Sequence, residues 1–157
     1  PSWKGTVLEP SQKAIKKGSK LFPKIKFING SLTKKKDMPK KVYDLAIICM
    51  VFSWIDRGLL SQAIANIDYL IKPGGYIIIR DFFSPHPQAN KYHHSKGLFT
   101  YKQDYSLPFL SMNIYTELFK NSAPVMNSNQ DNKDPYNFWT MNSILQKDLF
   151  GRYRKNR

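Results

Sequence analysis

The feature that most constrains the fold is a pair of apolar runs separated by a segment with helical periodicity. The first run, residues 42–50, and the second, residues 76–83, are too continuously apolar for strands with one face in water. Strands of parallel sheets are buried on both faces and have this composition. Between the runs, apolar residues from Leu59 to Ile71 recur at helical spacing. The sequence therefore predicts a strand, a helix from Asp56 onward and a second, parallel strand.

The same order of strand, helix and strand occurs once earlier in the sequence. Residues 5–10, "GTVLEP", predict a short strand, and Ser11 is a suitable N-cap for a lysine-coated helix that ends at Gly18. Residues 25–28 predict a second strand, which ends at Asn29-Gly30. Repeated strand, helix, strand units form parallel sheets with helices over both faces.

The region after the second unit has a different character. Lys72-Pro73-Gly74-Gly75 predicts the end of the preceding helix, because proline cannot continue it. Residues 84–110, rich in Pro, His and Tyr, predict an ordered insertion, with a short helix, that covers a substrate site. Residues 113–120 and 136–148 alternate and predict an antiparallel pair at the sheet edge. We expect one α/β domain, residues 1–157, with a Rossmann-like, mostly parallel sheet.

The net charge of +14 lies at the two ends of the sequence. Residues 1–42 hold twelve lysines against Glu9 and Asp37, residues 43–150 are neutral, and residues 151–157 add four positive charges. Such runs are commonly solvated faces. The single cysteine, Cys49, excludes a disulfide, and no apolar run is long enough to cross a bilayer. We expect a cytoplasmic protein with no membrane partner.

Ligands of open parallel sheets bind beyond the carboxyl ends of the strands. The predicted strands end at Glu9, at Asn29-Gly30-Ser31, at Cys49-Met50 and at Arg80-Asp81. A carboxylate in the position of Glu9 can accept hydrogen bonds from the two hydroxyls of a ribose. It can equally be a charge that caps the following helix. Gly30 would let a flat ring approach the backbone, or would serve as an ordinary turn glycine.

These residues resemble the class I methyltransferases that use S-adenosylmethionine. "VLEP" resembles the second strand of that family and its ribose-binding acid, Glu9, and "INGSL" resembles the turn that lines the adenine, here Gly30, Ser31 and Leu32. "YDLAIICMVFSWI" is similar to the fourth strand, which implies that the Cys49 backbone lies near the methionine end of the cofactor. "LIKPGGYIIIRDFF" resembles the helix, turn and fifth strand.

The sequence departs from the family in one respect. The family's first strand and glycine-rich loop would precede "PSWKGTVLE", and no Gly-x-Gly stands anywhere in the sequence. That strand lies between those that end at Glu9 and Cys49. Without it, two central strands would face each other across a gap. We therefore interpret the chain as the C-terminal part of a longer enzyme, and expect residues 1–157 alone to bind the cofactor weakly or not at all.

The carboxyl ends of the last two parallel strands predict an acceptor site. Asp81 would orient or deprotonate the acceptor, with His93 and Tyr101 as further catalytic candidates, and Phe52 and Trp54 would wall the site with Phe82 and Phe83. His86, His94 and Lys102 lie in the covering segment. Adjacent histidines rarely bind one metal together, so no metal site is expected.

The resemblance implies methyl transfer from S-adenosylmethionine to an O or N acceptor, whose identity the sequence does not reveal. Two alternatives stay open. One is a non-catalytic module that binds RNA or another polyanion through its basic ends. The other is a degenerate methyltransferase-like domain that serves as a partner subunit. Nothing in the sequence predicts the oligomeric state.

Overall fold

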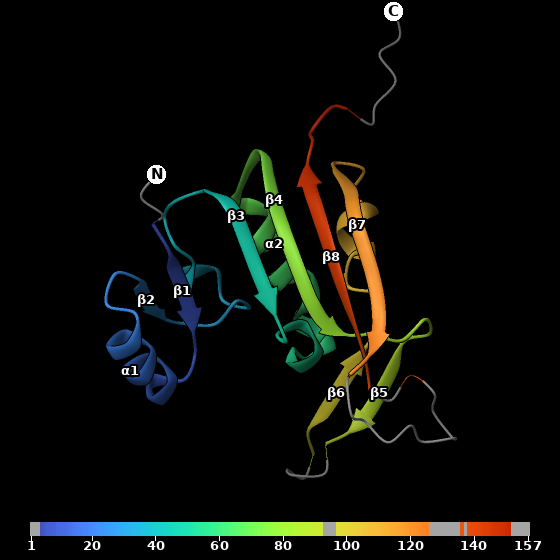
Figure 1. The fold of residues 1–157 in the computed structure, drawn as a ribbon, viewed down its shortest axis with the longest axis horizontal. Helices are drawn as coiled ribbons and strands as arrows, with labels where there is room; N and C mark the ends of the chain where they lie inside the picture. Colours follow the sequence, from blue (N-terminus) through green and yellow to red (C-terminus); the bar gives the residue numbers. More distant parts are fainter. Residues whose placement is uncertain (1–3, 93–96, 126–135, 137, 152–157) are drawn as a thin grey trace, which may run out of the picture.

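The computed structural model describes residues 4–92, 97–125, 136 and 138–151 of the chain. Its strands form a two-stranded sheet of β1 and β2, a four-stranded sheet in the order β3-β4-β8-β7 and a hairpin of β5 and β6 (Figure 1). The elements are β1 (Thr6–Glu9), α1 (Gln12–Leu21), β2 (Lys26–Asn29), η1 (Lys35–Asp37), β3 (Tyr43–Cys49), η2 (Phe52–Trp54), η3 (Arg57–Leu59), α2 (Leu60–Leu70), β4 (Ile71–Phe82), β5 (Gln88–Lys91), β6 (Phe99–Lys102), α3 (Leu107–Leu110), β7 (Tyr115–Pro124) and β8 (Trp139–Lys147).

Residues 4–42, which we call the N-terminal lobe, contain the first strand, helix, strand unit. β1 and β2 are parallel, as predicted, with Glu9 opposite Asn29. The Ser11 hydroxyl caps α1 by accepting a hydrogen bond from the Ala14 amide, 3.3 Å away. The helix does not end at Gly18, where the sequence predicted it to end. A Cβ at Gly18 would lie 2.7 Å from the Phe27 ring, so this glycine lets the helix pack closely on β2.

The second unit and the closing strands form the four-stranded sheet. β3 and β4 are parallel, with Ile47 opposite Ile78, and β8 pairs antiparallel with both β4 and β7. The predicted antiparallel pair at the sheet edge is therefore confirmed. One boundary was predicted wrongly: the strand begins at Ile71, so residues 72–75 lie inside β4. Gly74 keeps the positive φ of the predicted turn, +80°, and the register of β3 and β4 shifts there.

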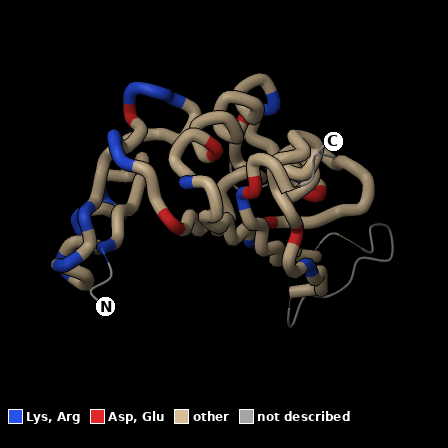
Figure 2. Tube along the Cα trace, turned by 90° about the horizontal axis from the view of Figure 1, so that it is seen from above, with Lys and Arg blue, Asp and Glu red and all other residues tan. Residues whose placement is uncertain are grey.

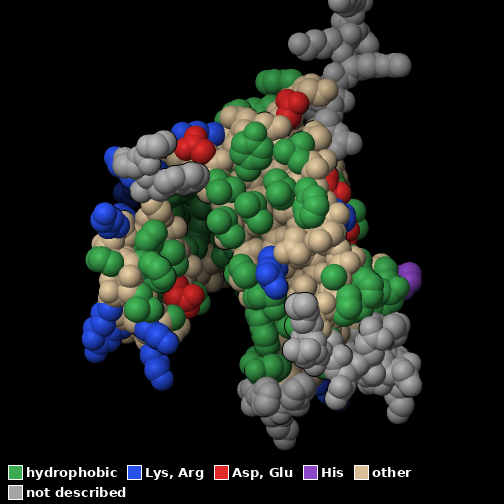
Figure 3. Space-filling model, viewed as in Figure 1, with side chains coloured by type: hydrophobic (Ala, Val, Ile, Leu, Met, Phe, Trp, Pro, Cys, Tyr) green, Lys and Arg blue, Asp and Glu red, His purple; other side chains and the backbone are tan. Residues whose placement is uncertain are grey.

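The two faces of the four-stranded sheet differ in burial. On one face, Ile77 and Ile79 are fully buried together with Ala63 and Ile67 of α2. The opposite face exposes Ile47, which is 67% accessible, together with Tyr76 of the adjacent β4 and Phe119 of β7 at the far edge of the sheet. Figure 3 shows hydrophobic side chains gathered over this second face. The apolar run of β3 is therefore covered on one side by the helix that follows it, and is exposed on the other.

The two parallel pairs are not joined into one sheet. Among the described residues, β1 pairs only with β2 and β3 pairs only with β4. Figure 1 shows β1 and β3 as neighbours whose arrowheads point the same way, with no described strand between them. Each strand therefore has an unpaired edge, as the sequence predicted. The lobe is instead tied to α2 by the Asn66 side chain, whose Nδ2 donates to the Leu32 carbonyl oxygen at 2.7 Å.

The Pro- and Tyr-rich segment is ordered where the structure describes it. It contains the β5–β6 hairpin, with Gln88 opposite Lys102, and the short helix α3, which includes the fully buried Phe109. The sequence predicted the short helix and not the hairpin. Among the described residues, none of the helices has the length and apolar character of a membrane-spanning segment.

A buried lysine fixes the end of α2. Lys147 of β8 is 7% exposed, and its Nζ lies 2.8 Å from both the backbone carbonyl oxygen and the carboxylate Oδ1 of Asp68. The Tyr115 hydroxyl donates to the same carboxylate at 2.7 Å. A cation at a helix C-terminus also interacts favourably with the helix dipole. This cluster joins the closing strands to the helix that covers the sheet.

We predict that Lys147→Met destabilises the protein by about 2–3 kcal/mol, because it leaves a carboxylate and the last helix carbonyls with fewer donors in a buried setting. Chemical denaturation with urea measures the change. Lys72→Met is the matched control: its ion pair with Asp44 is 2.9 Å long, but both partners are exposed. It should change stability by less than about 1 kcal/mol. Equal effects of the two substitutions would contradict this account.

Candidate functional site

The carboxyl ends of β1 and β2 bring two predicted cofactor residues together. Glu9 ends β1, and its backbone oxygen accepts hydrogen bonds from the Gly30 amide and the Asn29 side chain, both at 3.2 Å. Its Oε1 accepts from the Ser11 amide at 2.8 Å. Its Oε2 has no donor among the residues that the structure describes. The Glu9 carboxylate thus accepts a hydrogen bond at the start of α1 with one oxygen, and its other oxygen is not used within the described residues.

The turn after β2 is built around Asp37. A Cβ at Gly30 would lie 2.7 Å from the Asp37 Cβ and 3.0 Å from the Leu8 side chain, so a larger residue would not fit here. The Asp37 carboxylate accepts a hydrogen bond from the Ser31 amide at 2.9 Å. The glycine is therefore required by packing within the turn. Leu32 packs against the core next to α2.

The chain after β3 turns sharply at a strained residue. Cys49, the last residue of β3, is exposed, and Met50 has a φ of +55°, which a residue with a side chain rarely adopts. The Met50 amide donates to the Arg80 carbonyl oxygen of β4 at 2.8 Å. This bond continues the pairing of β3 with β4 for one further residue and fixes where the chain leaves the sheet.

A buried carboxylate holds the rest of this turn. The side chain of Asp81 is fully buried, and its Oδ2 accepts hydrogen bonds from the amides of Val51, Phe52 and Ser53 at 3.0, 2.8 and 3.4 Å. Its Oδ1 accepts from the Phe82 amide at 2.8 Å. Burial raises the pKa of Asp81, and the hydrogen bonds from Ser53 and the backbone act in the opposite direction.

These contacts give Asp81 a clear positioning function. Three converging amides favour the carboxylate over the protonated acid, and they belong to the loop that carries the predicted acceptor wall. Neither oxygen of Asp81 is presented at the surface, since the side chain has no accessible area. In this structure Asp81 contacts the backbone of the predicted wall and holds it in place.

Arg57, which the sequence analysis did not single out, anchors the same loop from the other side. Its guanidinium donates to the carbonyl oxygens of Phe52, at 2.6 Å, and of Ile55, and lies 4.2 Å above the ring centroid of Tyr101. It also donates to the Tyr105 hydroxyl at 3.3 Å. Its two tyrosine partners are more than forty residues away in the sequence, so no local pattern could have indicated that Arg57 joins the loop to them.

The hairpin and the segment that follows it contact the loop through aromatic rings. Phe52 is fully buried and stacks on Tyr105 with ring centroids 5.3 Å apart. Trp54 is 43% exposed and meets the Tyr92 ring edge-on at 4.9 Å. Burial raises the pKa of Tyr105 far above its usual range, so its hydroxyl stays protonated and donates to the Tyr101 carbonyl oxygen at 2.7 Å. Phe52 is thus a core residue, whereas Trp54 is partly exposed at the surface.

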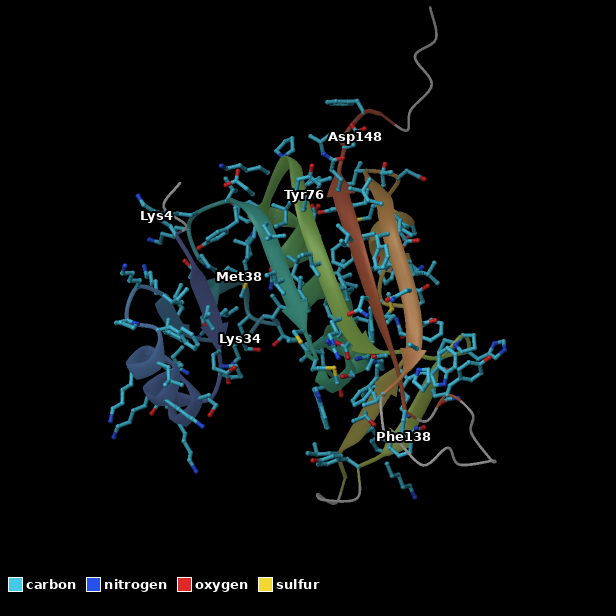
Figure 4. The ribbon with its side chains drawn as sticks, in the orientation of Figure 1. Lys4, Lys34, Met38, Tyr76, Phe138 and Asp148 are labelled. Atoms are coloured by element: carbon cyan, nitrogen blue, oxygen red, sulfur yellow. The ribbon has the colours of Figure 1, made fainter. Side chains whose placement is uncertain are left out.

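The hairpin and the β4 end lie at the lower end of the four-stranded sheet in Figure 4, which labels Phe138 beside the hairpin. His93 and His94 lie outside the described residues. His86 is exposed and follows β4 directly, and Lys102 is 4% exposed, with its Nζ 5.9 Å from the Phe82 ring centroid. Within the described ranges, no cluster of three His, Cys, Asp or Glu side chains is placed to hold a metal ion.

A pocket of about 350 Å³ lies elsewhere, between α2 and the loop that contains η1. Met38 contributes to its lining together with Asn66 and Tyr69 of α2. Figure 4 labels Met38 between β1 and β3. None of the predicted site residues lines this pocket. It is therefore separate from the carboxyl ends of the strands.

Comparison with known proteins identifies the fold. Residues 3–79 match the family described as "Methyltransferase domain". The solved structures with the same fold include the N-methyltransferase NodS from Bradyrhizobium japonicum WM9 in complex with S-adenosyl-L-homocysteine, at a TM-score of 0.65 and 12% identity. They also include 1,6-didemethyltoxoflavin-N1-methyltransferase from Burkholderia thailandensis, with its acceptor and S-adenosylhomocysteine bound, at 0.66 and 12% identity. A third is an S-adenosylmethionine-dependent methyltransferase from Methanosarcina mazei, at 0.65 and 12% identity.

The chain has the Rossmann-like fold of the class I S-adenosylmethionine-dependent methyltransferases, as the sequence predicted. S-adenosylmethionine is the cofactor of this class. The alignments cover 92%, 91% and 92% of this chain but only 66%, 60% and 82% of the three solved chains, in the order given. The chain thus spans less than two thirds of the NodS chain in the S-adenosyl-L-homocysteine complex, and less than two thirds of the toxoflavin enzyme. No curated protein matches the sequence.

We predict that Asp81→Asn destabilises the protein by about 2–3 kcal/mol. An amide has one acceptor oxygen, and its NH₂ group would face backbone donors in a buried site. Thermal and urea unfolding measure the loss. Asp56→Asn is the control, because the Asp56 carboxylate accepts one exposed hydrogen bond, from the Gly58 amide at 2.8 Å, and asparagine caps equally well. A loss for Asp81→Asn no larger than that of the control would show that the three amides do not depend on the charge.

A second ion pair gives a pH prediction. Asp104, just after the hairpin, lies 2.7 Å from the Lys120 Nζ of β7 and accepts from the Ser106 amide at 3.0 Å. Burial acts to raise the pKa of Asp104, but the hydrogen bonds from Lys120 and Ser106 outweigh it and leave the pKa below its usual value. A lowered pKa in the folded state contributes stability above the unfolded pKa that is lost as pH falls through the folded pKa.

Asp104→Asn should therefore cost about 1 kcal/mol at neutral pH and progressively less below the ordinary aspartate pKa of about 4. Urea unfolding of both proteins at neutral and acidic pH measures the difference. A cost that does not depend on pH would assign the effect to the neutral hydrogen bonds of Ser106 and not to the charge.

Proposed function

We propose that the chain is the C-terminal part of a methyltransferase that moves the methyl group of S-adenosylmethionine to an oxygen or nitrogen acceptor. The observation that carries the proposal is the position of Glu9. It ends a parallel strand beside Asn29 and Gly30, and one of its carboxylate oxygens has no donor among the described residues. Carboxylates in this position hold the ribose hydroxyls of nucleoside cofactors in parallel α/β sheets.

The residues at the carboxyl ends of the strands suit the parts of the cofactor. Glu9 would accept the ribose hydroxyls, the turn formed by Gly30, Ser31 and Leu32 would border the adenine, and the backbone of Cys49 would lie at the methionine end. The bound cofactor supplies an electrophilic methyl group on a positively charged sulfur. The residues of the chain hold and orient it, and keep water away from the reacting atoms.

The loop after β3 forms the acceptor side in this proposal. Trp54, partly exposed at the edge of the hairpin, would contact the acceptor, with Phe52 packed behind it. Asp81 would act through the backbone of residues 51–53, as a positioning residue and not as the base. Tyr101 lies beneath Arg57 and would likewise act as a positioning residue. His93, which lies outside the described residues, is then the remaining candidate for proton transfer.

The unpaired edges of β1 and β3 support the further proposal that a strand inserts between them in the complete enzyme. Such a strand would pair with both edges and satisfy their backbone donors and acceptors. The solved methyltransferases are longer than the aligned part, which agrees with additional structure. By the same reasoning, residues 1–157 alone would bind the cofactor weakly.

We predict that the protein at its full natural length binds S-adenosylhomocysteine and that Glu9→Gln weakens binding by about tenfold or more, since a neutral amide loses a charge-assisted hydrogen bond to the ribose. Isothermal titration calorimetry measures both affinities. Asp44→Asn is the matched control, because Asp44 is an exposed acid at the opposite end of β3. No binding by the natural protein would refute the function, and equal affinities of the two variants would refute the role of Glu9.

A further inference from the structure

The positive charge of the protein is concentrated on the N-terminal lobe. All twelve lysines of residues 4–42 are exposed, and Glu9 and Asp37 are the only acids in this range. Figure 2 shows the lysine and arginine segments gathered on this part of the chain, and Figure 3 shows basic side chains projecting from the lobe. The rest of the described chain carries basic and acidic residues together.

This charge is not neutralised within the protein. Among the described residues, the ion pairs are Lys72–Asp44, Lys120–Asp104, Lys120–Glu117 and Lys147–Asp68, and none involves a lysine of the lobe. The two acids of the lobe make local contacts instead: Glu9 accepts from the Ser11 amide and Asp37 from the Ser31 amide. The lobe therefore presents an unpaired excess of positive charge to its surroundings.

The lysines of α1 are arranged with two exposed apolar residues. Lys13, Lys16, Lys17 and Lys20 follow the spacing of one helix face, while Ile15 and Gly18 face β2. At the end of the helix, Leu21 is 62% and Phe22 is 59% exposed. This lysine face ends in an exposed leucine and phenylalanine, with Lys24 just beyond. It therefore combines positive charge with exposed apolar side chains, the two features of helices that bind at a membrane interface.

We propose that the N-terminal lobe binds an anionic lipid surface through the α1 lysines, with Leu21 and Phe22 entering the headgroup region. Lysines attract anionic leaflets without specific geometry, and the apolar pair adds a second, short-range contact. RNA fits less well, because recognition of single strands uses several aromatic rings along a basic groove and Phe22 is the one aromatic residue in the exposed α1 surface. The sequence predicted no membrane partner because no run spans a bilayer, and surface binding needs no such run.

This inference is independent of the proposed function, although the two would act together. α1 begins three residues after Glu9, at the carboxyl end of β1. Binding of the lobe to a lipid surface would therefore bring the candidate cofactor edge close to that surface. A methyl acceptor in the membrane or at its surface would then be within reach.

The test is co-sedimentation of the full chain with phosphatidylcholine vesicles that contain about 30 mol % phosphatidylserine, at about 0.1 M salt. The protein should partition onto these vesicles and not onto pure phosphatidylcholine. The variant Lys13→Gln/Lys16→Gln/Lys17→Gln/Lys20→Gln should bind at least about tenfold more weakly. Leu21→Ser/Phe22→Ser, which keeps the charge, should also bind several-fold more weakly.

Two controls make the result decisive. Lys72→Gln/Lys91→Gln removes two exposed lysines outside the lobe and should bind like the unaltered protein, whereas Lys16→Gln/Lys17→Gln removes the same charge from α1 and should not. Circular dichroism melting shows that each variant is folded. Equal binding with and without phosphatidylserine, no effect of the α1 substitutions, or tighter binding to poly(U) RNA than to the vesicles would each overturn the proposal. Calorimetry with S-adenosylhomocysteine reports separately on the methyltransferase function.

Discussion

The structure of the candidate site depends on the desolvated carboxylate of Asp81. β3 and β4 pair in parallel with Cys49 opposite Arg80, so Asp81 lies one step beyond the last pair, next to the chain that leaves β3. A charge in an apolar core needs donors, and here the amides of residues 51–53 supply them. The same bonds hold the turn that follows Met50 and carries Phe52 and Trp54. One acidic residue thereby determines the shape of the edge where a ligand would bind.

Arg57 acts on the same loop from the opposite side. It binds two carbonyl oxygens of the loop and lies over Tyr101, so the hairpin and the loop form one unit. Asp81 satisfies the amides of the turn and Arg57 satisfies its carbonyls. This division explains how a loop that contains only short 3-10 turns can be both buried and ordered, since its buried backbone groups find partners.

The N-terminal lobe is attached to the rest of the protein in a different way. It is attached through the Asn66–Leu32 hydrogen bond and not through a shared sheet, because β1 and β3 leave edges unpaired. Its charge is likewise separate from that of the neutral remainder. Cofactor binding and surface binding are proposed for neighbouring parts of this lobe, the first at the end of β1 and the second along the helix that follows. The geometry therefore links the two proposals without making either depend on the other.

The amino-acid sequence by itself determined the two strand, helix, strand units, the parallel pairing within each and the antiparallel closing pair, because these follow from apolar periodicity and turn residues that act locally. The gap between β1 and β3 was predicted from the resemblance to the methyltransferase family and not from such a local pattern. It misplaced the end of α1 and the start of β4, since Gly18 serves packing on Phe27 and the glycines after Lys72 lie within a strand. Only the tertiary structure decided the roles of Asp81, Arg57 and Lys147. Their partners are 1 to 79 residues away, and whether a buried charge is held by backbone groups depends on which distant segments pack around it.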